Sequence, residues 1–278
     1  MKSARPFRPS SPVQAKKSLG QHFLRNAAVA ERIARTVEDA AFPSDILEIG
    51  PGMGILTQFL WQLPGRRVHM VELDRESVAY LQATFPDKTT DGQLLSGDFL
   101  KLDLNPLFEG QPFCLIGNYP YNISSQILFK AVECRHRIPV ISGMFQKEVA
   151  ERVAAGPGSK TYGILSVWVQ AFYEAEYLFT VEPCEFNPPP QVRSGVIRLI
   201  RKADYHLPCD EVLFLKVVKA AFGQRRKTLR NALRALDSGN PSAAVNLAAV
   251  PERYLSLRAE QLSVSDFVTL TQALTPAV

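Results

Sequence analysis

Short apolar segments alternate with segments of helical period along the first 150 residues of the chain. The apolar segments are bounded by turn-forming or charged residues and are predicted as strands, over residues 45–50, 67–72, 93–97, 113–118 and 140–145. The first and the fourth are nearly continuous apolar runs, which is typical of parallel strands that are buried on both faces. The alternation predicts strand–helix–strand units and a doubly wound α/β sheet.

The pattern changes after a Gly/Pro/Ser loop at residues 156–159. Residues 164–172 and 195–200 are both predicted as strands, because no helix-length spacer pattern separates them. If they pair in antiparallel fashion at one edge, the sheet has seven strands. That Rossmann-like arrangement is typical of class I methyltransferases rather than of the six-stranded dinucleotide fold.

From residue 210 onward only helical periodicity is found. Helices are predicted over residues 211–222, 225–236 and 243–248, and a last helix follows Ser263, where Ser-Val-Ser-Asp has the pattern of a capping box. We therefore expect three parts in the chain. They are a disordered basic arm over residues 1–18, an α/β domain of the methyltransferase type over 19–203 and a small all-helical domain over 204–278, whose basic residues make it the expected RNA-binding domain.

The predicted arm has no apolar core of a secretory signal, and its three prolines oppose the amphipathic helix of an organellar transit peptide. No apolar run approaches the ~20 residues of a membrane helix. Four well-separated cysteines predict neither a zinc site nor a disulfide framework, and they fit a reducing compartment. We expect a cytoplasmic protein without membrane contact, with a monomer as the default.

Positive charge is concentrated in two segments of a chain whose formal net charge is +5. Residues 1–35 hold eight bases and one acid, and residues 212–236 hold seven bases and no acid. Such clusters suit a polyphosphate partner, although a solvated helix face is the commoner explanation of any one cluster.

A basic stripe is predicted on the helix over residues 225–236. Arg226, Arg230 and Arg234 follow one another at intervals of four, and leucines occupy another face. Together with Lys227, this stripe is predicted to meet several phosphates of an RNA partner.

A glycine-rich turn closes the first predicted strand. Residues 48–54 read Glu-Ile-Gly-Pro-Gly-Met-Gly, with a helix expected from about Ile55. Gly50 and Gly52 let the backbone pass close to a ligand that faces the helix N–H groups. A tight strand-to-helix turn explains the glycines alone equally well. The G-x-G-x-G spacing differs from the dinucleotide pattern G-x-G-x-x-G.

Two acidic residues follow the next two strands. Glu72 ends the second strand, where a carboxylate can accept hydrogen bonds from both ribose hydroxyls of an adenosyl group. Asp98 follows the third strand and can accept from an adenine amino group, although it also suits a helix cap. Three contacts at successive strand ends predict an adenosyl cofactor, S-adenosylmethionine.

The fourth strand ends in the tetrapeptide Asn118-Tyr-Pro-Tyr121. An exocyclic adenine nitrogen is a poor nucleophile, so catalysis must hold it in line with the methyl group and accept its protons, as the Asn118 side-chain carbonyl can. Tyr121 can stack on an unstacked base, and Phe186 can supply a second aromatic face. A proline turn with packed aromatic rings, and a core position for Phe186, are the alternatives. The chemistry requires neither a thiol nucleophile nor a metal.

Five segments in order give the chain a strong likeness to one family. Together they resemble the small-subunit rRNA adenine dimethyltransferases, and the last resembles the bacterial branch rather than the large-subunit resistance methylases. The segments are residues 16–24, 48–54, 117–124, 186–190 and 222–230.

The resemblance implies N6-dimethylation of two adjacent adenines in a hairpin loop near the 3′ end of small-subunit (16S) rRNA, late in subunit assembly. It also implies the residues that line the cofactor site, which are His22, Leu24, Gly50, Glu72, Asp98 and Asn118. Two positions depart from the family pattern, since His22 stands where Asn is usual and Tyr119 where Leu is usual. A His ring still donates or accepts one hydrogen bond, so binding is expected to survive.

Two other functions remain open from the sequence. Methylases of DNA adenine or of protein glutamine use a similar Asn-Pro tetrapeptide, and an RNA-binding assembly factor or transcription cofactor can retain a vestigial site. The segment from residue 16 to 24 and the basic helices favour folded RNA as the partner.

Overall fold

The computed structural model describes residues 13–90, 92–236 and 247–275. The chain divides into two compact units, of which the first comprises residues 1–150 and 176–201 and the second residues 151–175 and 202–278. Residues 1–12 of the predicted arm and most of the helix predicted at 243–248 lie outside the described residues.

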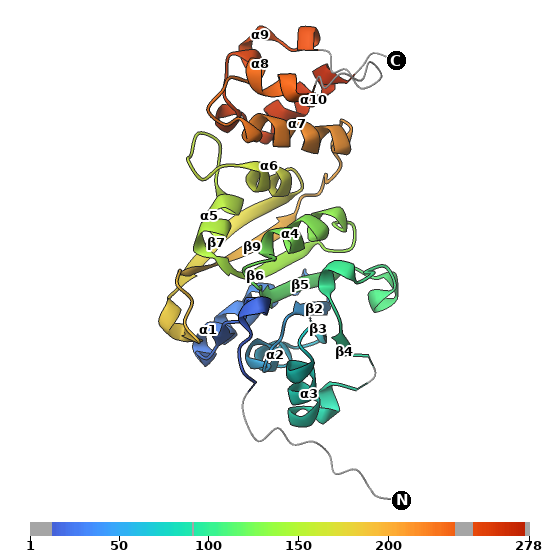
Figure 1. Ribbon diagram of the computed structural model, residues 1–278. Coiled ribbons are helices and arrows are strands. Elements are labelled where there is room, and N and C mark those ends of the chain that lie inside the picture. The colour runs from blue at the N-terminus through green and yellow to red at the C-terminus, as the bar shows by residue number, and fades with distance from the viewer. Residues whose placement is uncertain (1–12, 91, 237–246, 276–278) are drawn as a thin grey trace, which may run out of the picture. The chain divides into compact units, whose positions relative to one another are not determined.

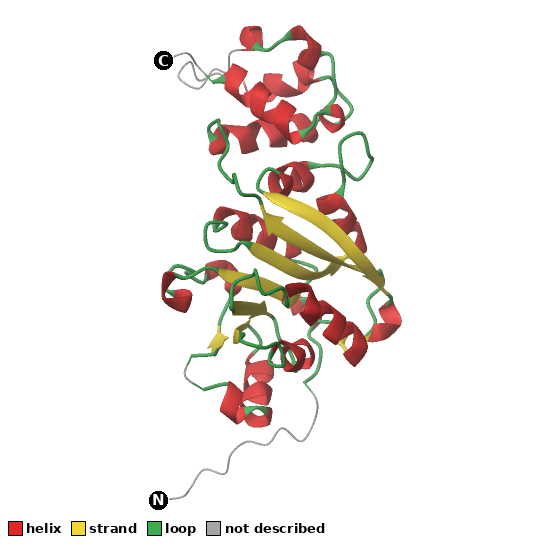
Figure 2. Cartoon of the chain, turned by 180° about the vertical axis from the view of Figure 1, so that it is seen from behind, coloured by secondary structure: helices red, strands yellow, loops and turns green. Residues whose placement is uncertain are grey.

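A seven-stranded sheet with the order β4-β3-β2-β5-β6-β9-β7 confirms the predicted fold class (Figures 1 and 2). The strands β2, β3, β4, β5 and β6 run parallel, and β9 is antiparallel to β6. The bounds of the strands in this sheet are β2 Asp45–Ile49, β3 Arg67–Glu72, β4 Leu94–Ser96, β5 Phe113–Asn118, β6 Val140–Gln146, β7 Tyr173–Val181 and β9 Ser194–Arg201.

Two very short strands form a second sheet that the sequence pattern did not reveal. β1, Phe23–Leu24, pairs antiparallel with β8, Phe186–Asn187. Because each strand has two residues, neither shows a period that predicts it. The pairing brings the segment before α1 next to the proline-rich segment that follows β7.

Two helices of the first unit begin at side chains that satisfy unpaired N–H groups. Asn26 caps α1 by accepting from Ala28 and Val29, and Asp74 caps α3 by accepting from Glu76. The helix bounds are α1 Ala27–Ala34, α2 Ile55–Leu60, α3 Arg75–Thr84, α4 Ser124–Glu133 and α5 Lys147–Ala154, the last of which crosses into the second unit.

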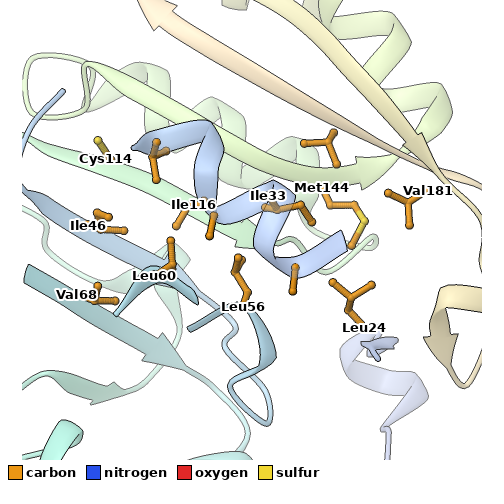
Figure 3. Packing of buried hydrophobic residues seen from close by; sticks show 14 of the residues in the cluster. Leu24, Ile33, Ile46, Leu56, Leu60, Val68, Cys114, Ile116, Met144 and Val181 are labelled. Atoms are coloured by element: carbon orange, nitrogen blue, oxygen red, sulfur yellow. The ribbon is translucent and has the colours of Figure 1, made fainter. Parts of the chain in front are cut away.

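The main core of the first unit lies where α1 and α2 cover one face of the sheet (Figure 3). Ile33 of α1 and Leu60 of α2 are fully buried against Ile46 of β2 and Ile116 of β5. Each such side chain contributes about 1.5–3 kcal/mol through burial. This packing fixes α2, and with it the glycine-rich turn that precedes it, against the centre of the sheet.

The prediction of a strand over residues 164–172 is wrong, because Ile164–Gln170 form the helix α6. The segment is almost entirely buried and apolar except at Ser166 and Gln170, and such a run does not distinguish a buried strand from a buried helix. Tertiary contacts select the helix. The hydroxyl of Ser166 accepts from Gly163 N–H and donates to the Arg152 carbonyl. The edge strand β7 follows α6 instead.

The second unit contains the remaining helices, whose bounds are α6 Ile164–Gln170, α7 Glu211–Gly223, α8 Leu229–Ala232, α9 Glu252–Leu255 and α10 Val264–Leu274. The capping box predicted before the last helix is confirmed, since Ser263 and Asp266 exchange hydrogen bonds at the start of α10. The first residue predicted for the helix over residues 225–236 is wrong. α8 begins at Leu229, whose N–H donates to the Leu257 carbonyl, and residues 224–226 form a turn.

Every basic residue of the predicted stripe is nonetheless exposed. Arg226 and Lys227 precede α8, so they do not share a helical spacing with Arg230 and Arg234. Leu229 and Leu233 are fully buried on the packed side. Arg230 forms an ion pair with Glu252.

Among the described residues, no helix is both long enough and apolar enough to cross a lipid bilayer.

Glu48 is a buried carboxyl in the middle of the otherwise apolar strand β2. Its side chain is 1% exposed, and its Oε2 finds no hydrogen-bond partner among the described residues. Burial raises the pKa of Glu48 from 4.5 to about 8, and the nearby Glu72 carboxylate adds to this rise.

The free energy of unfolding is therefore expected to fall as the pH rises. Between pH 4.5 and 8 the folded chain binds the Glu48 proton and the unfolded chain does not, so stability is lost across this range. Glu48→Gln keeps the shape of the side chain and cannot ionise. We expect the variant to gain on the order of a few kcal/mol over the wild type at pH 8–9 and little at pH 5.

Denaturant unfolding of the unliganded protein at a series of pH values measures this difference. The exposed residue Glu133 in α4 offers a matched control, since Glu133→Gln is expected to leave the pH profile unchanged. Parallel profiles for the wild type and Glu48→Gln would contradict the prediction.

Candidate active site

A cavity of about 270 Å³ lies in the first unit at the carboxyl ends of β2, β3 and β5. Open α/β sheets bind ligands at these strand ends. The cavity is lined by most of the residues predicted to bind the cofactor, namely His22, Gly50, Gly52, Glu72, Asp98 and Asn118, and also by Tyr121. The structure thus brings together residues that are up to 100 positions apart in the chain.

The glycine-rich turn follows β2 and has left-handed backbone at three positions. Gly50, Gly52 and Gly54 have φ values of +64°, +58° and +82°. A Cβ on Gly52 would lie 3.0 Å from the Phe23 ring, whereas a Cβ on Gly50 would meet no atom within 4 Å. Both the conformation and the close approach of Phe23 require glycine at position 52. Gly50 leaves open space at the cavity wall.

The Glu72 carboxylate holds this turn to the end of β3. Its Oε2 accepts from Gly52 N–H at 3.0 Å and its Oε1 accepts from Asp74 N–H at 2.8 Å. Burial raises the pKa of Glu72, and these two hydrogen bonds oppose the rise. A carboxylate has about four acceptor positions, so each oxygen retains one for a ligand hydroxyl.

Asp98 combines the two roles that the sequence allowed. It lines the cavity, and its Oδ1 accepts from Leu100 N–H at 2.9 Å to cap the short helix Phe99–Lys101. The neighbouring Gly97 faces open space, and Leu73 lines the cavity with half of its surface exposed. A carboxylate beside an exposed apolar side chain and an open backbone position can receive a flat heterocycle with an amino group.

Asn118 ends β5 and lines the cavity. Its Nδ2 donates to the main-chain carbonyl of His22 at 3.0 Å. Because a carbonyl only accepts, this bond assigns the amide nitrogen to the His22 side and leaves Oδ1 as an acceptor. No described residue donates to that oxygen. The amide oxygen is therefore arranged to accept a hydrogen bond from a ligand.

The two tyrosines of the tetrapeptide lie in different environments. Tyr119 is 1% exposed and its hydroxyl donates to the Ser142 carbonyl. Tyr121 lines the cavity, and its hydroxyl shares a hydrogen bond of 2.5 Å with Ser194 of β9. Burial raises the pKa of both tyrosines, so both are neutral at physiological pH.

Leu24 and Phe186 are not brought into the cavity. They face each other across the β1–β8 pair, with exposed fractions of 5% and 1%, and both belong to the apolar core, in which Figure 3 shows Leu24. As the structure stands, the Phe186 ring presents no open face to a base, so its predicted stacking role requires a movement and stays a prediction. The same holds for a side-chain contact of Leu24 with the cofactor.

The segment before β1 contributes residues that the sequence analysis did not assign. Residues 18–23 line the cavity, and Lys17–Leu19 form a short helical turn. Lys16 donates to Asp74 at 2.6 Å, and Gln21 donates to the other Asp74 oxygen at 3.2 Å. Residues 16–18, which were predicted as part of the basic arm, therefore pack against the rest of the first unit. Only the inclusion of residue 16 in the resembling segment hinted at this role.

Comparison with known proteins identifies the family. Residues 13–273 match the model described as "Ribosomal RNA adenine dimethylase". The "Ribosomal RNA small subunit methyltransferase A" of Phocaeicola vulgatus is 53% identical over 267 residues, which cover 96% of this chain and 91% of that protein. The protein with the same name from Parabacteroides distasonis is 55% identical over 261 residues, covering 93% of each.

Solved structures agree with this assignment. A dimethyladenosine transferase from Plasmodium falciparum superposes with a TM-score of 0.73 at 26% identity, over 90% of this chain and 96% of that chain. The 23S rRNA methyltransferase ErmE shares the fold, with a TM-score of 0.65 at 24% identity over 91% of this chain and 99% of that chain. The chain therefore belongs to the ribosomal RNA adenine dimethylase family.

Proposed function

We propose that this protein transfers methyl groups from S-adenosylmethionine to the N6 amino groups of two adjacent adenines in a hairpin loop near the 3′ end of small-subunit (16S) rRNA. The single observation that carries the proposal is the Asn118 amide, which ends β5 in the cavity with its oxygen ready to accept a hydrogen bond. Relatives named as small-subunit methyltransferases support the choice of RNA.

The cavity fits an adenosyl cofactor. Open space at Gly50 and Gly97 admits a ligand next to the backbone, and the remaining acceptor positions of Glu72 suit ribose hydroxyls. Asp98 would accept from the adenine amino group. When bound, S-adenosylmethionine supplies an electrophilic methyl group on a positively charged sulfur.

The protein's own contribution to transfer is positioning and hydrogen-bond acceptance. Asn118 Oδ1 accepts a hydrogen bond from the N6 amino group of the target adenine and thereby favours a pyramidal nitrogen whose lone pair is available, and the proton that N6 loses on methylation passes to solvent. Tyr121, held at its hydroxyl by Ser194, provides a ring on which the extruded base stacks. Neither residue changes its own protonation state in this step.

Exposed arginine and lysine side chains of the second unit would bind the phosphates of the rRNA backbone. The four side chains of the predicted stripe are all exposed, namely Arg226, Lys227, Arg230 and Arg234, whereas Leu229 and Leu233 hold this segment to the core.

We further propose that the protein acts as a monomer in the cytoplasm on RNA within an assembling small subunit. Tyr121 and Asn118 are both neutral at physiological pH, so methyl transfer at that pH does not require either side chain to change its charge.

A direct assay tests this function. Purified protein with labelled S-adenosylmethionine is incubated with assembling small subunits, duplex DNA or a release factor, and mass spectrometry locates the product. The proposal expects dimethyladenosine in small-subunit rRNA alone, and its loss from cells that lack the protein. Transfer to DNA or to a glutamine amide, or no transfer, would overturn it.

Asn118→Ala is expected to lower the rate of methyl transfer by on the order of 10²–10³-fold, because the acceptor for the N6 proton is lost. RNA affinity should change less than twofold, since the phosphate contacts lie on other residues. Single-turnover methylation and filter binding measure the two quantities. The exposed Asn105 provides a control, and an unaltered rate in Asn118→Ala would reject the assigned role.

Binding of rRNA is expected to weaken with salt, with log K falling by about 0.7–0.9 per phosphate contact for each unit of log salt concentration. Arg226→Glu should reduce the affinity at every salt concentration and flatten this slope. Lys88→Glu, the same charge change at an exposed site of the first unit, is the matched control. An affinity that is independent of salt, or equal losses in both variants, would contradict the prediction.

A further inference from the structure

His22 makes three contacts, which connect Asn118 and Tyr121 of the proposed methyl-transfer site with the segment that follows β8. Its main-chain carbonyl accepts from Asn118 Nδ2 at 3.0 Å. Its ring nitrogen Nδ1 lies 2.9 Å from the Pro188 carbonyl oxygen. Its ring also packs beside that of Tyr121, with centroids 5.5 Å apart and planes inclined by 30°. His22 thus contacts Asn118 and Tyr121, two of the three catalytic candidates, and also Pro188, which follows β8.

The hydrogen bond to Pro188 fixes which nitrogen of the ring carries a proton. A carbonyl oxygen only accepts, so Nδ1 must be the protonated atom. This contact follows from strand pairing, because Phe23 lies opposite Asn187 and the next positions outward are His22 and Pro188. The imidazole is thereby held at one edge and is not free to rotate.

The fixed imidazole restricts the Tyr121 ring. The distance and tilt between the two rings fall in the range that aromatic pairs prefer, and such a pair is worth about 0.5–1.5 kcal/mol. The far end of Tyr121 is held by the buried Ser194. Tyr121 is therefore constrained at its hydroxyl by β9 and along its ring by His22.

We propose that the His22 side chain is a positioning residue for methyl transfer, which holds Tyr121 in the orientation that stacks on the target base. This inference rests on the proposed function and deepens it. It also differs from the cofactor contact that the family pattern implies for this position. The imidazole acts through Tyr121, while the main-chain carbonyl orients Asn118.

Three substitutions separate the contacts of the side chain. His22→Ala removes both, His22→Phe keeps the ring and loses the bond to Pro188, and His22→Asn keeps a donor and loses the ring. His206→Ala is a matched control, since His206 packs on Tyr205 at 4.5 Å and 34° but does not line the cavity. All four variants retain the main-chain carbonyl of the substituted residue.

The experiment measures kcat and KM for rRNA and, by calorimetry, the Kd for S-adenosylmethionine. We expect His22→Ala to lower kcat about tenfold with KM for rRNA and the cofactor Kd changed less than twofold, because misplacement of a stacked base slows transfer more than binding. His22→Phe and His22→Asn should each recover part of kcat, and His206→Ala should match the wild type. A tenfold rise in the cofactor Kd with unchanged kcat, or an unchanged kcat in His22→Ala, would overturn the proposal.

A structural readout keeps this test independent of turnover. Crystal structures of the wild type and of His22→Ala are expected to show Tyr121 in different side-chain orientations. If Tyr121 stays in place without the imidazole, the positioning role is wrong even where the enzyme is active. If the wild type transfers no methyl group to any rRNA substrate, the proposed function fails instead, and the Tyr121 orientation still decides whether His22 positions that ring.

Discussion

The position of the tetrapeptide that ends β5 depends on how its own residue Tyr119 packs in the core. A Cβ on Gly143 of β6 would lie 2.7 Å from the Tyr119 ring and 2.2 Å from the Gly117 carbonyl oxygen, and a Cβ on Gly117 of β5 would lie 2.6 Å from the Ile49 carbonyl oxygen, so both strands must have glycine here. The ring fills this space and its hydroxyl donates to Ser142 O. Because Tyr119 is anchored in the core, its neighbours Asn118 and Tyr121 are held at the cavity. The tyrosine that departs from the family pattern thus has a defined structural role.

The segment before β1 closes the other side of the cavity through contacts distant in sequence. Lys16 and Gln21 bind Asp74, which also caps α3, and His22 binds Asn118. Burial raises the pKa of Asp74, but the hydrogen bonds from Lys16 and Gln21 outweigh it and lower the pKa overall. Asp74 is therefore ionised at neutral pH, which keeps the ion pair with Lys16 intact. The cofactor cavity is built jointly by the sheet and by this segment.

The sequence predicted those parts of the fold whose signal is local. The five parallel strands and the capping box at Ser263 have a clear period or cap. Ile164–Gln170 was predicted wrongly because the helix is almost entirely buried and has only two polar residues, Ser166 and Gln170, which are too few to reveal its period. The start of α8 was predicted wrongly because Leu229 N–H is bound by Leu257, a contact that local propensity does not encode.

Much of the candidate site was predicted for a similar reason. Gly50, Glu72, Asp98 and Asn118 each end or follow a predicted strand, and parallel strands bring these ends to one edge. The pairings of His22 with Tyr121 and of Lys16 with Asp74 cross 58 or more positions between different elements. Nothing in a local pattern specifies them. Phe186 has the right residue type for stacking, and only the tertiary structure shows that its ring is buried.

The charges of the cavity decide which part of each partner can enter it. Its acidic lining residues are Glu72 and Asp98, and no Lys or Arg is among the described residues that line it. A pyrophosphate would meet carboxylates without a cation to neutralise it, which disfavours dinucleotides, whereas a cationic sulfonium gains Coulomb energy. The same carboxylates repel the phosphates of an RNA and favour a neutral nucleobase. In the proposed function, the phosphates of the substrate are therefore bound by other residues than those that line this cavity, which is the role proposed for the exposed arginine and lysine side chains of residues 226–234.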